Sequence, residues 1–591
     1  MTKPVLPALL TLAAVLSACG SDKSTSPTPG CGPAASASVR AGTSAITDQG
    51  SLGPMQAITI NADGLPNCLT LDADSGTYIV VPQFATGSGA RSEVAYDLGV
   101  STPMSADRRG PSFSRTVGLD GVAVPRPLTP QARLDAALRE REHALAPLAP
   151  EAVARWRASA SLRAPVSAAT PPLGSTRTFQ VLNDLDGGSF STDTATLRYV
   201  GTNIMIYVSQ DAPPPPNGFT DTQLSSFGQL FDRDLYQIDV RTFGSPSDID
   251  ANGHVIVLLT PKVNALTQAS SCQSQGYVSG FFYGVDLTPS QAHSNKGEIF
   301  YSLVPDSTGV FSCAHTVSDV EFNTPATFIH EFQHMISWNQ HVIVRNGPDE
   351  ALWLNEGLSH IAEEMGSRYY ESRYPAPLGR TNPAQIFPDS AEGFISGDLF
   401  NAYAYMLDPS TVSITEFIKS GTVQERGGAW LFLRWLGDQK DSTIYAKLEQ
   451  TSATGIANVE AQSGEPFPHL FGDFTLALYT DSLATVARSD VPARLRFQSR
   501  NLRVLFRALY NATSRRDLVP RPWPLPLDTL NDPGSRSSSM VPGTAQYYVV
   551  HLPHPAPAAR ITFAPSSGGA FPSTLAAQAT VFQCPSSAAC Q

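Results

Sequence analysis

Two neighbouring segments of the chain place apolar residues at helical spacing. In the first segment these residues are Phe328, Ile329, Phe332, Met335 and Ile336. In the second segment, Asp349 to Met365, they are Leu354, Leu358, Ile361 and Met365. Such a spacing predicts two amphipathic helices. Thr324 is a suitable N-cap and Pro325 suits a first helical position, so we expect the first helix to begin there.

Short runs of alternating or β-branched residues predict strands on both sides of these helices. Before the helices, strands at 56–60, 77–84 and 93–100 predict a small β domain over residues 46–100. After them, strands at 547–552, 560–563 and 579–584 predict a C-terminal β-rich module over residues 491–591. Residues 101–175 are rich in Pro, Ala and Arg, with one helical patch at 130–148. We interpret them as a linker or pro-like segment.

The central region, residues 176–490, mixes both kinds of element. Strands are predicted at 195–200, 204–209, 254–259 and 298–303, and a helix at 220–236. Beyond Glu364 the pattern is mainly helical. We therefore expect an α+β fold, in which a mixed sheet and a mainly helical lobe are flanked by small β domains.

The stretch Asp248-Ile249-Asp250-Ala251-Asn252-Gly253 is similar to the start of a calcium-binding loop. Such a loop takes a bidentate glutamate at its twelfth position. Here that position holds Leu259. A tight turn is therefore the favoured interpretation.

The polar face of the first predicted helix carries His330, Glu331 and His334. Histidines four residues apart lie one helical turn apart, so both imidazoles can reach one tetrahedral ion. The glutamate between them can reach a water at that ion. A core helix with two hydrogen-bonded histidines is the alternative, but it gives no reason for a carboxylate and two imidazoles on one polar face. The motif predicts a zinc peptidase site.

The second predicted helix offers a third ligand. Its polar face carries Glu356, Ser359, His360 and Glu363. Alone, Glu356 would be interpreted as a solvated helix carboxylate. Beside the two histidines it becomes the candidate third metal ligand, while His360 and Glu363 are placed to orient the ligands by hydrogen bonds.

A metzincin arrangement can be excluded from the numbering. It requires a glycine three residues and a histidine six residues after the second histidine. Those positions hold Ser337 and Gln340. His341 comes one residue too late, which turns it away from the ion by about 100° on a helix.

The chain resembles the gluzincin peptidases, in which the third ligand is a glutamate on a helix that follows the His-Glu-x-x-His helix. It is most similar to the hyicolysin-like family of secreted zinc peptidases, through His-Glu-Phe-Gln-His-Met at 330–335 and Trp-Leu-Asn-Glu-Gly-Leu-Ser at 353–359. The gap between the motifs is three residues longer than is usual in the aminopeptidase branch. The resemblance covers about residues 174–490.

This resemblance implies that His330, His334 and Glu356 hold Zn²⁺ and that Glu331 is the general base. It also implies that the strand at 298–303 is an edge strand that binds the substrate backbone. A further donor is needed for the oxyanion. The candidates are Tyr369, Tyr370, Tyr403, Tyr405 and His360, and the sequence does not choose among them.

The length of the chain limits the number of folded units, and its net charge limits the classes of partner. A chain of 591 residues exceeds the size of a single core, so at least two folded units are expected. Its formal net charge of −12 argues against a nucleic-acid surface. A protein or peptide substrate is the expected partner.

The N-terminus has the features of an export signal. Lys3 precedes an apolar run, and residues 1–18 end at Leu16-Ser17-Ala18 before Cys19. These last four residues resemble a bacterial lipobox, which implies lipidation of Cys19. Gly20 follows instead of aspartate, so the resemblance implies an outer-membrane lipoprotein. Residues 19–45 have the composition of a flexible tether.

Six cysteines remain besides Cys19, and an even number in an exported chain predicts disulfides. Nearest-neighbour pairing gives Cys31 with Cys68, Cys272 with Cys313, and Cys584 with Cys590. None has the spacing of a cysteine zinc site.

The resulting hypothesis is a lipid-anchored, zinc-dependent endopeptidase. An inactive pseudo-peptidase that acts as a binding module is the first alternative. An aminopeptidase is the second, but the chain lacks the Gly-Ala-Met-Glu-Asn stretch that would bind a free amino terminus.

Overall fold

The computed structural model describes most of the chain after residue 128. The described residues are 38–39, 52, 54–61, 68–71, 76–86, 92–101, 129–161, 170–371, 389–417, 421–481, 483–511, 519–530, 534–552 and 559–590. The expected signal segment, Cys19 and Cys31 lie outside them, as does the expected tether apart from Ser38–Val39.

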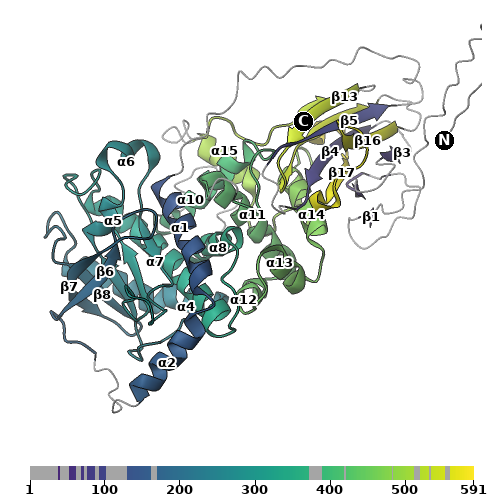
Figure 1. Ribbon diagram of the computed structural model, residues 1–591. Coiled ribbons are helices and arrows are strands. Elements are labelled where there is room, and N and C mark those ends of the chain that lie inside the picture. The colour runs from purple at the N-terminus through teal and green to yellow at the C-terminus, as the bar shows by residue number, and fades with distance from the viewer. Residues whose placement is uncertain are drawn as a thin grey trace, which may run out of the picture.

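A six-stranded mixed sheet forms one end of the molecule (Figure 1). Its strand order is β10-β11-β9-β8-β7-β6. Strand β9 is parallel to both of its neighbours, β8 and β11, and the remaining pairs are antiparallel. The bounds are β6 (Thr176–Leu182), β7 (Phe190–Val200), β8 (Ile204–Ser209), β9 (Val255–Leu259), β10 (Gly280–Phe282) and β11 (Ile299–Ser302).

Helices lie against this sheet and fill the centre of the molecule (Figure 1). In the first half they are α1 (Pro130–Leu145), α2 (Ala149–Ser161), α3 (Asp221–Leu230), η1 (Phe231–Leu235), α4 (Tyr236–Thr242), α5 (Pro261–Ala265) and α6 (Ala269–Gln275). Around the site they are α7 (Val317–Trp338), η2 (Asn339–Ile343), α8 (Leu352–Glu371), α10 (Asp389–Met406) and α11 (Val423–Lys440). Further along they are α12 (Thr443–Glu449), α13 (Gly455–Ser463), α14 (Phe467–Thr480), η4 (Arg488–Asp490), η5 (Ala493–Leu495) and α15 (Leu502–Asn511). The short helices η7 (Ser573–Leu575) and η8 (Ser587–Cys590) follow β16 and β17 near the C-terminus.

The helix that carries the histidine motif begins earlier than predicted. It starts at Val317, and its N-cap is Thr316, whose side chain accepts a hydrogen bond from the Asp319 N–H. Thr324 is instead inside the helix, where its hydroxyl donates to the Val320 carbonyl. The expected start at Pro325 was wrong because an acidic first turn behind a threonine cap extends the helix upstream. Pro325 lies within the helix.

Two further sheets form a sandwich at the other end of the molecule (Figure 1). The first has the order β1-β2-β17-β4-β15-β12, with β14 also paired to β4, and the second has the order β13-β5-β16-β3. The bounds are β1 (Ser38–Val39), β2 (Ala57–Asn61), β3 (Cys68–Leu71), β4 (Gly76–Phe84), β5 (Val94–Ser101), β12 (Asp528–Leu530), β13 (Gly534–Met540), β14 (Thr544–Ala545), β15 (Tyr548–Leu552), β16 (Ala559–Pro565) and β17 (Ala577–Gln583).

Strands from the two ends of the chain alternate within these sheets. C-terminal β17 lies between N-terminal β2 and β4, and N-terminal β5 lies between β13 and β16. Tyr78, Tyr96 and Phe563 share one hydrophobic core between the two sheets. The strands expected in two separate β modules therefore form one sandwich. Alternation within each strand does not reveal which strand it pairs with.

Helix α1 lies in the range that was interpreted as a linker, but it packs into the main core. Leu134 and Leu138 are buried there. Asp135 of α1 also forms an ion pair with Arg426 of α11. A segment with too few apolar residues to form its own core can still pack its apolar face against the core of another domain.

The fold is α+β, as predicted. Among the described residues, no helix is both apolar and long enough to cross a bilayer.

Candidate metal centre

Helices α7 and α8 bring their polar faces together. His334 Nδ1 lies 2.5 Å from Asn355 Oδ1 and 3.0 Å from Ser359 Oγ. His330 Nδ1 lies 2.6 Å from Glu363 Oε1. Residues of α8 therefore hold both rings through Nδ1. An Nδ1–H that donates to an oxygen leaves Nε2 unprotonated and free to ligate a metal.

The two Nε2 atoms and Glu356 converge on one point. The Nε2 atoms of His330 and His334 lie 3.2 Å apart. Glu356 places one carboxylate oxygen 3.8 Å from His330 Nε2 and the other 3.7 Å from His334 Nε2. Tetrahedral zinc with bonds of about 2.0–2.2 Å separates its ligand atoms by about 3.3–3.5 Å. The three side chains fit such an ion with small adjustments.

Burying the ionised carboxylate of Glu356 costs free energy unless a cation compensates its charge. Its side chain is 0% exposed. Arg426 Nη1 lies 2.7 Å from Oε2. Burial alone would raise the pKa of Glu356, but the charges of Arg426 and His330 lower it, so the carboxylate is ionised. An ionised carboxylate and a neutral imidazole are ligand forms that zinc requires.

Burial also keeps His334 neutral. The loss of solvent, the charge of Arg139 and the neighbouring His330 lower its pKa well below the usual value. For His330 the net shift in pKa has the opposite direction. Burial lowers its pKa, but the hydrogen bond and negative charge of Glu363 raise it above the usual value. A bound dication would oppose that protonation at Nε2.

Two other groups of side chains in this part of the molecule could be considered for a metal. His330, His360 and Glu363 form one. However, His330 Nδ1 and Glu363 Oε1 are 2.6 Å apart, which is a hydrogen-bond distance and shorter than zinc ligands allow. This geometry assigns Glu363 to orienting the ring.

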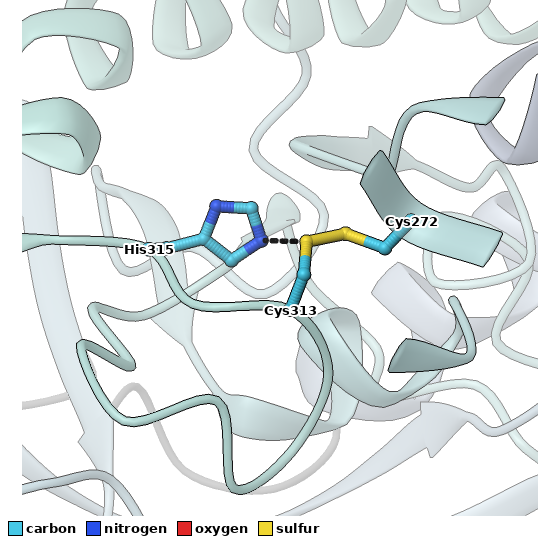
Figure 2. Close-up of side chains that lie close together, drawn as sticks. All are labelled: Cys272, Cys313 and His315. Atoms are coloured by element: carbon cyan, nitrogen blue, oxygen red, sulfur yellow. Dashed lines mark hydrogen bonds between the residues drawn. A yellow bond between two sulfur atoms is a disulfide. The ribbon is translucent and has the colours of Figure 1, made fainter. Parts of the chain in front are cut away.

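The second group, Cys272, Cys313 and His315, is shown in Figure 2. Its two sulfurs are joined in a disulfide, and His315 Nε2 lies 3.5 Å from Cys313 Sγ. Metal binding requires thiolates, which a disulfide does not provide. The predicted pairs Cys272–Cys313 and Cys584–Cys590 are both confirmed, whereas Cys31 lies outside the described residues.

Glu331 lies beside the convergent ligands without belonging to them. Its Oε2 accepts a hydrogen bond of 2.7 Å from the Phe282 N–H at the end of β10. Burial and then the negative charges of Asp135 and Glu356 raise its pKa to about 8, against the opposing charge of His330. A dication nearby would lower that pKa by direct attraction. The carboxylate is thus held in place by the backbone of the sheet edge.

A cleft of about 450 Å³ opens onto these residues. His330, Glu331, His360 and Arg426 line it, together with Gln131 at the start of α1. A cavity of this size with few convergent polar groups is typical of a ligand site. Arg426 and Gln131 were not predicted from the sequence, because both reach the cleft only through the packing of distant helices.

The strand expected at the sheet edge is an inner strand. β11 pairs with both β9 and β10, so β10 is the edge. Side chains of α1 already bind the outer backbone groups of β10. Gln131 donates to the Gly280 carbonyl at 3.0 Å, and Arg139 donates to the Phe282 carbonyl at 3.0 Å. Substrate pairing along these two residues is therefore blocked while α1 is in place.

The structure distinguishes among the five candidate donors to the oxyanion. Tyr369 donates to Asp234 and Tyr403 donates to the Arg521 carbonyl. Tyr405 is fully buried in the main core, and the Tyr370 side chain lies outside the described residues. His360 is the candidate found among the described residues that line the cleft. Burial lowers its pKa, but Glu363 and Asp398 raise it to about 10, which favours a cationic donor.

Comparison with known proteins finds a partial match. No family model matches the chain. Over 172 residues, however, the chain is 30% identical to the neutral metalloprotease ShpI of Staphylococcus hyicus. The match covers 29% of this chain and 36% of ShpI, so the chain spans about a third of the length of this relative. This similarity supports a metal-dependent protease.

Proposed function

We propose that the chain is a zinc-dependent endopeptidase of the gluzincin type. The observation that carries this proposal is the convergence of His330 Nε2, His334 Nε2 and the Glu356 carboxylate. Glu331 lines the same cleft as the candidate ligand His330. Three ligands with an open fourth position are typical of catalytic rather than structural zinc.

The chemistry divides between the metal and the side chains. When bound, zinc would supply a Lewis acid that lowers the pKa of a water towards about 7 and polarises a peptide carbonyl. Glu331 takes the proton of that water as the water attacks the carbonyl carbon, and then delivers the proton to the leaving amine. His360 and Arg426 line the cleft as cations and can stabilise the negative charge that develops on the carbonyl oxygen.

Glu363 and Asn355 have a supporting role in this proposal. Each accepts the Nδ1 proton of one ligand histidine, which fixes the tautomer and the ring plane. Asp398 lies 2.8 Å from His360 Nδ1 and would fix that ring in the same way. The arrangement therefore orients every imidazole of the cleft through a second side chain.

Cleavage of an unstructured protein tests the proposal. The purified chain, incubated with a disordered substrate, is expected to cut internal peptide bonds, and mass spectrometry of the fragments locates them. A zinc chelator should stop cleavage, and added Zn²⁺ should restore it. Release of single N-terminal residues would favour the aminopeptidase alternative, and no cleavage across varied substrates would favour the pseudo-peptidase.

We further propose that Cys19 carries a lipid that anchors the chain to a bacterial membrane, and that Gly20 after it directs the protein to the outer membrane. Replacing Cys19 by Ser is expected to move the protein from the membrane to the soluble fraction without loss of its proteolytic activity. Fractionation with antibody detection is the measurement, and the parent chain is the control. Membrane retention equal to that of the parent would contradict the anchor.

A further inference from the structure

The turn at residues 248–253 lies beside a glutamate from a distant part of the chain. The turn leads into β9, and Glu298 immediately precedes β11. β9 and β11 are parallel neighbours, so the segments before them meet at the same end of the sheet. The Ile256 N–H donates to the Glu298 carbonyl at 2.7 Å, which fixes this approach.

Three carboxylates converge there. Asp248, Asp250 and Glu298 each offer an oxygen, and these atoms all lie within 4.8 Å of one another. Glu298 is 1% exposed. Its Oε1 accepts hydrogen bonds from Ser247 Oγ at 2.6 Å and from the Ile249 N–H at 2.9 Å. Its Oε2 is buried and has no hydrogen-bond partner among the described residues.

The turn shares several features with the first half of a calcium loop. Asp248 Oδ1 accepts hydrogen bonds from the N–H groups of Asn252 at 3.1 Å and Gly253 at 3.3 Å. Gly253, at the sixth position, has φ 71°, where calcium loops require glycine. The side chains at positions one, three and five are Asp248, Asp250 and Asn252, as in such loops.

The carboxylate that the twelfth position would supply comes from Glu298 instead. Leu259, at the twelfth position, is buried within β9 and cannot serve. Glu298 reaches the same turn through the neighbouring strand. The interpretation of residues 248–253 as a plain tight turn therefore omits a ligand that only the sheet pairing brings in.

Electrostatics supports a cation at this position. Burial, and then the charges of Asp250 and Asp248, raise the pKa of Glu298 to about 7 against its hydrogen bonds. Burial and Asp248 likewise raise the pKa of Asp250 to about 6, while Arg177 opposes the shift. Arg177 itself donates to the Asn295 carbonyl at 2.7 Å. Negative charges held close to a buried carboxylate are destabilising unless a cation neutralises them.

We propose that Asp248, Asp250, Asn252 and Glu298 form a Ca²⁺ site that joins the starts of β9 and β11. All four side chains offer oxygen ligands, which Ca²⁺ prefers and Zn²⁺ does not. The partly exposed turn leaves room for the water ligands that complete a shell of six to eight oxygens. Because β11 packs under α7, where Phe300 contacts Phe328, the ion would stabilise the sheet that supports the metal centre.

Calcium binding and thermal unfolding of the full chain test this site. The parent, freed of calcium and with its zinc content verified, is titrated with CaCl₂ by calorimetry and melted with and without the salt. We expect one Ca²⁺ per chain, with a dissociation constant at or below about 10⁻³ M, the range of extracellular sites. At saturating calcium the melting temperature should rise by about 5 °C, and MgCl₂ at equal concentration should give a much smaller rise.

Two substitutions and one control locate the effect. Glu298→Gln keeps the acceptor for Ser247 but removes the buried charge, so it should melt no lower than the parent without calcium and show no rise with it. Asp250→Asn should lose the rise as well. Asp184→Asn is the control. Asp184 Oδ1 accepts hydrogen bonds from the N–H groups of Asp186 and Gly188 in a similar acidic turn. Among the described residues, this turn does not belong to any group of side chains that could hold a metal.

Each outcome decides the proposal. Calcium binding by the parent and Asp184→Asn, with loss in both Glu298→Gln and Asp250→Asn, supports the site. A parent that does not respond to calcium, a Glu298→Gln variant that still responds, or an equal response to magnesium overturns it. None of these results depends on proteolytic activity.

Discussion

Replacing Glu331 by Gln is expected to slow peptide-bond cleavage by about 10²- to 10⁴-fold, the contribution typical of a general base. The zinc content and the melting temperature should remain those of the parent, because Glu331 is not one of the convergent ligands. Glutamine can also accept the hydrogen bond that the Phe282 N–H donates to Glu331. The measurement is the initial rate on a disordered protein substrate, with zinc quantified in the same samples.

A matched control lies on the same helix. Glu321 is exposed on α7 and accepts a hydrogen bond from Gln223, away from the cleft. Glu321→Gln makes the same chemical change and should leave the rate unchanged. A Glu331→Gln variant that cleaves as fast as the parent would contradict the proposed role of this residue.

Replacing Glu356 by Ala should remove zinc binding, because the site then keeps two ligands of three. His334→Ala should have the same effect. Glu363→Ala distinguishes ligands from orienting residues, since loss of an outer partner typically weakens metal binding by only about 10- to 100-fold. The measurement is a competition titration of zinc against a chelator of known affinity.

Glu356→Ala also removes one of the ion-pair partners of buried Arg426, and Asp135 is the other, so this substitution can destabilise the fold for a reason unrelated to zinc. Glu356→Gln keeps the shape of the side chain and serves as the second variant. Thermal melts without metal check that each variant is folded. Normal zinc affinity in Glu356→Ala with loss in Glu363→Ala would show that the third ligand was misidentified.

The candidate ligands could be predicted because they lie in two segments whose apolar residues have helical spacing. His330 and His334 share one helical face, and Glu356 lies on the face of the next helix that must turn towards them. Helical spacing fixes such faces before any packing is known. The start of α7 was missed because Pro325 resembles an N-terminal signal, although a better cap precedes it at Thr316.

Features that depend on contacts between distant segments were not predictable. Arg426 reaches Glu356 only because α11 packs beside α8, and Gln131 reaches β10 only because α1 lies on the sheet edge. Similarly, Glu298 joins the turn at Asp248 through the parallel pairing of β9 and β11. No local spacing encodes these pairings, since strand partners and helix neighbours are chosen by the whole fold.

The X-ray absorption spectrum of the zinc-loaded protein at the zinc edge tests the central claim most directly. We expect one zinc per chain with only nitrogen and oxygen ligands at about 2.0–2.2 Å, and with the outer-shell scattering of two imidazoles. Loss of the imidazole scattering in His334→Ala would assign it to this site. A sulfur shell at about 2.3 Å, or a folded protein that retains no zinc, would contradict the claim.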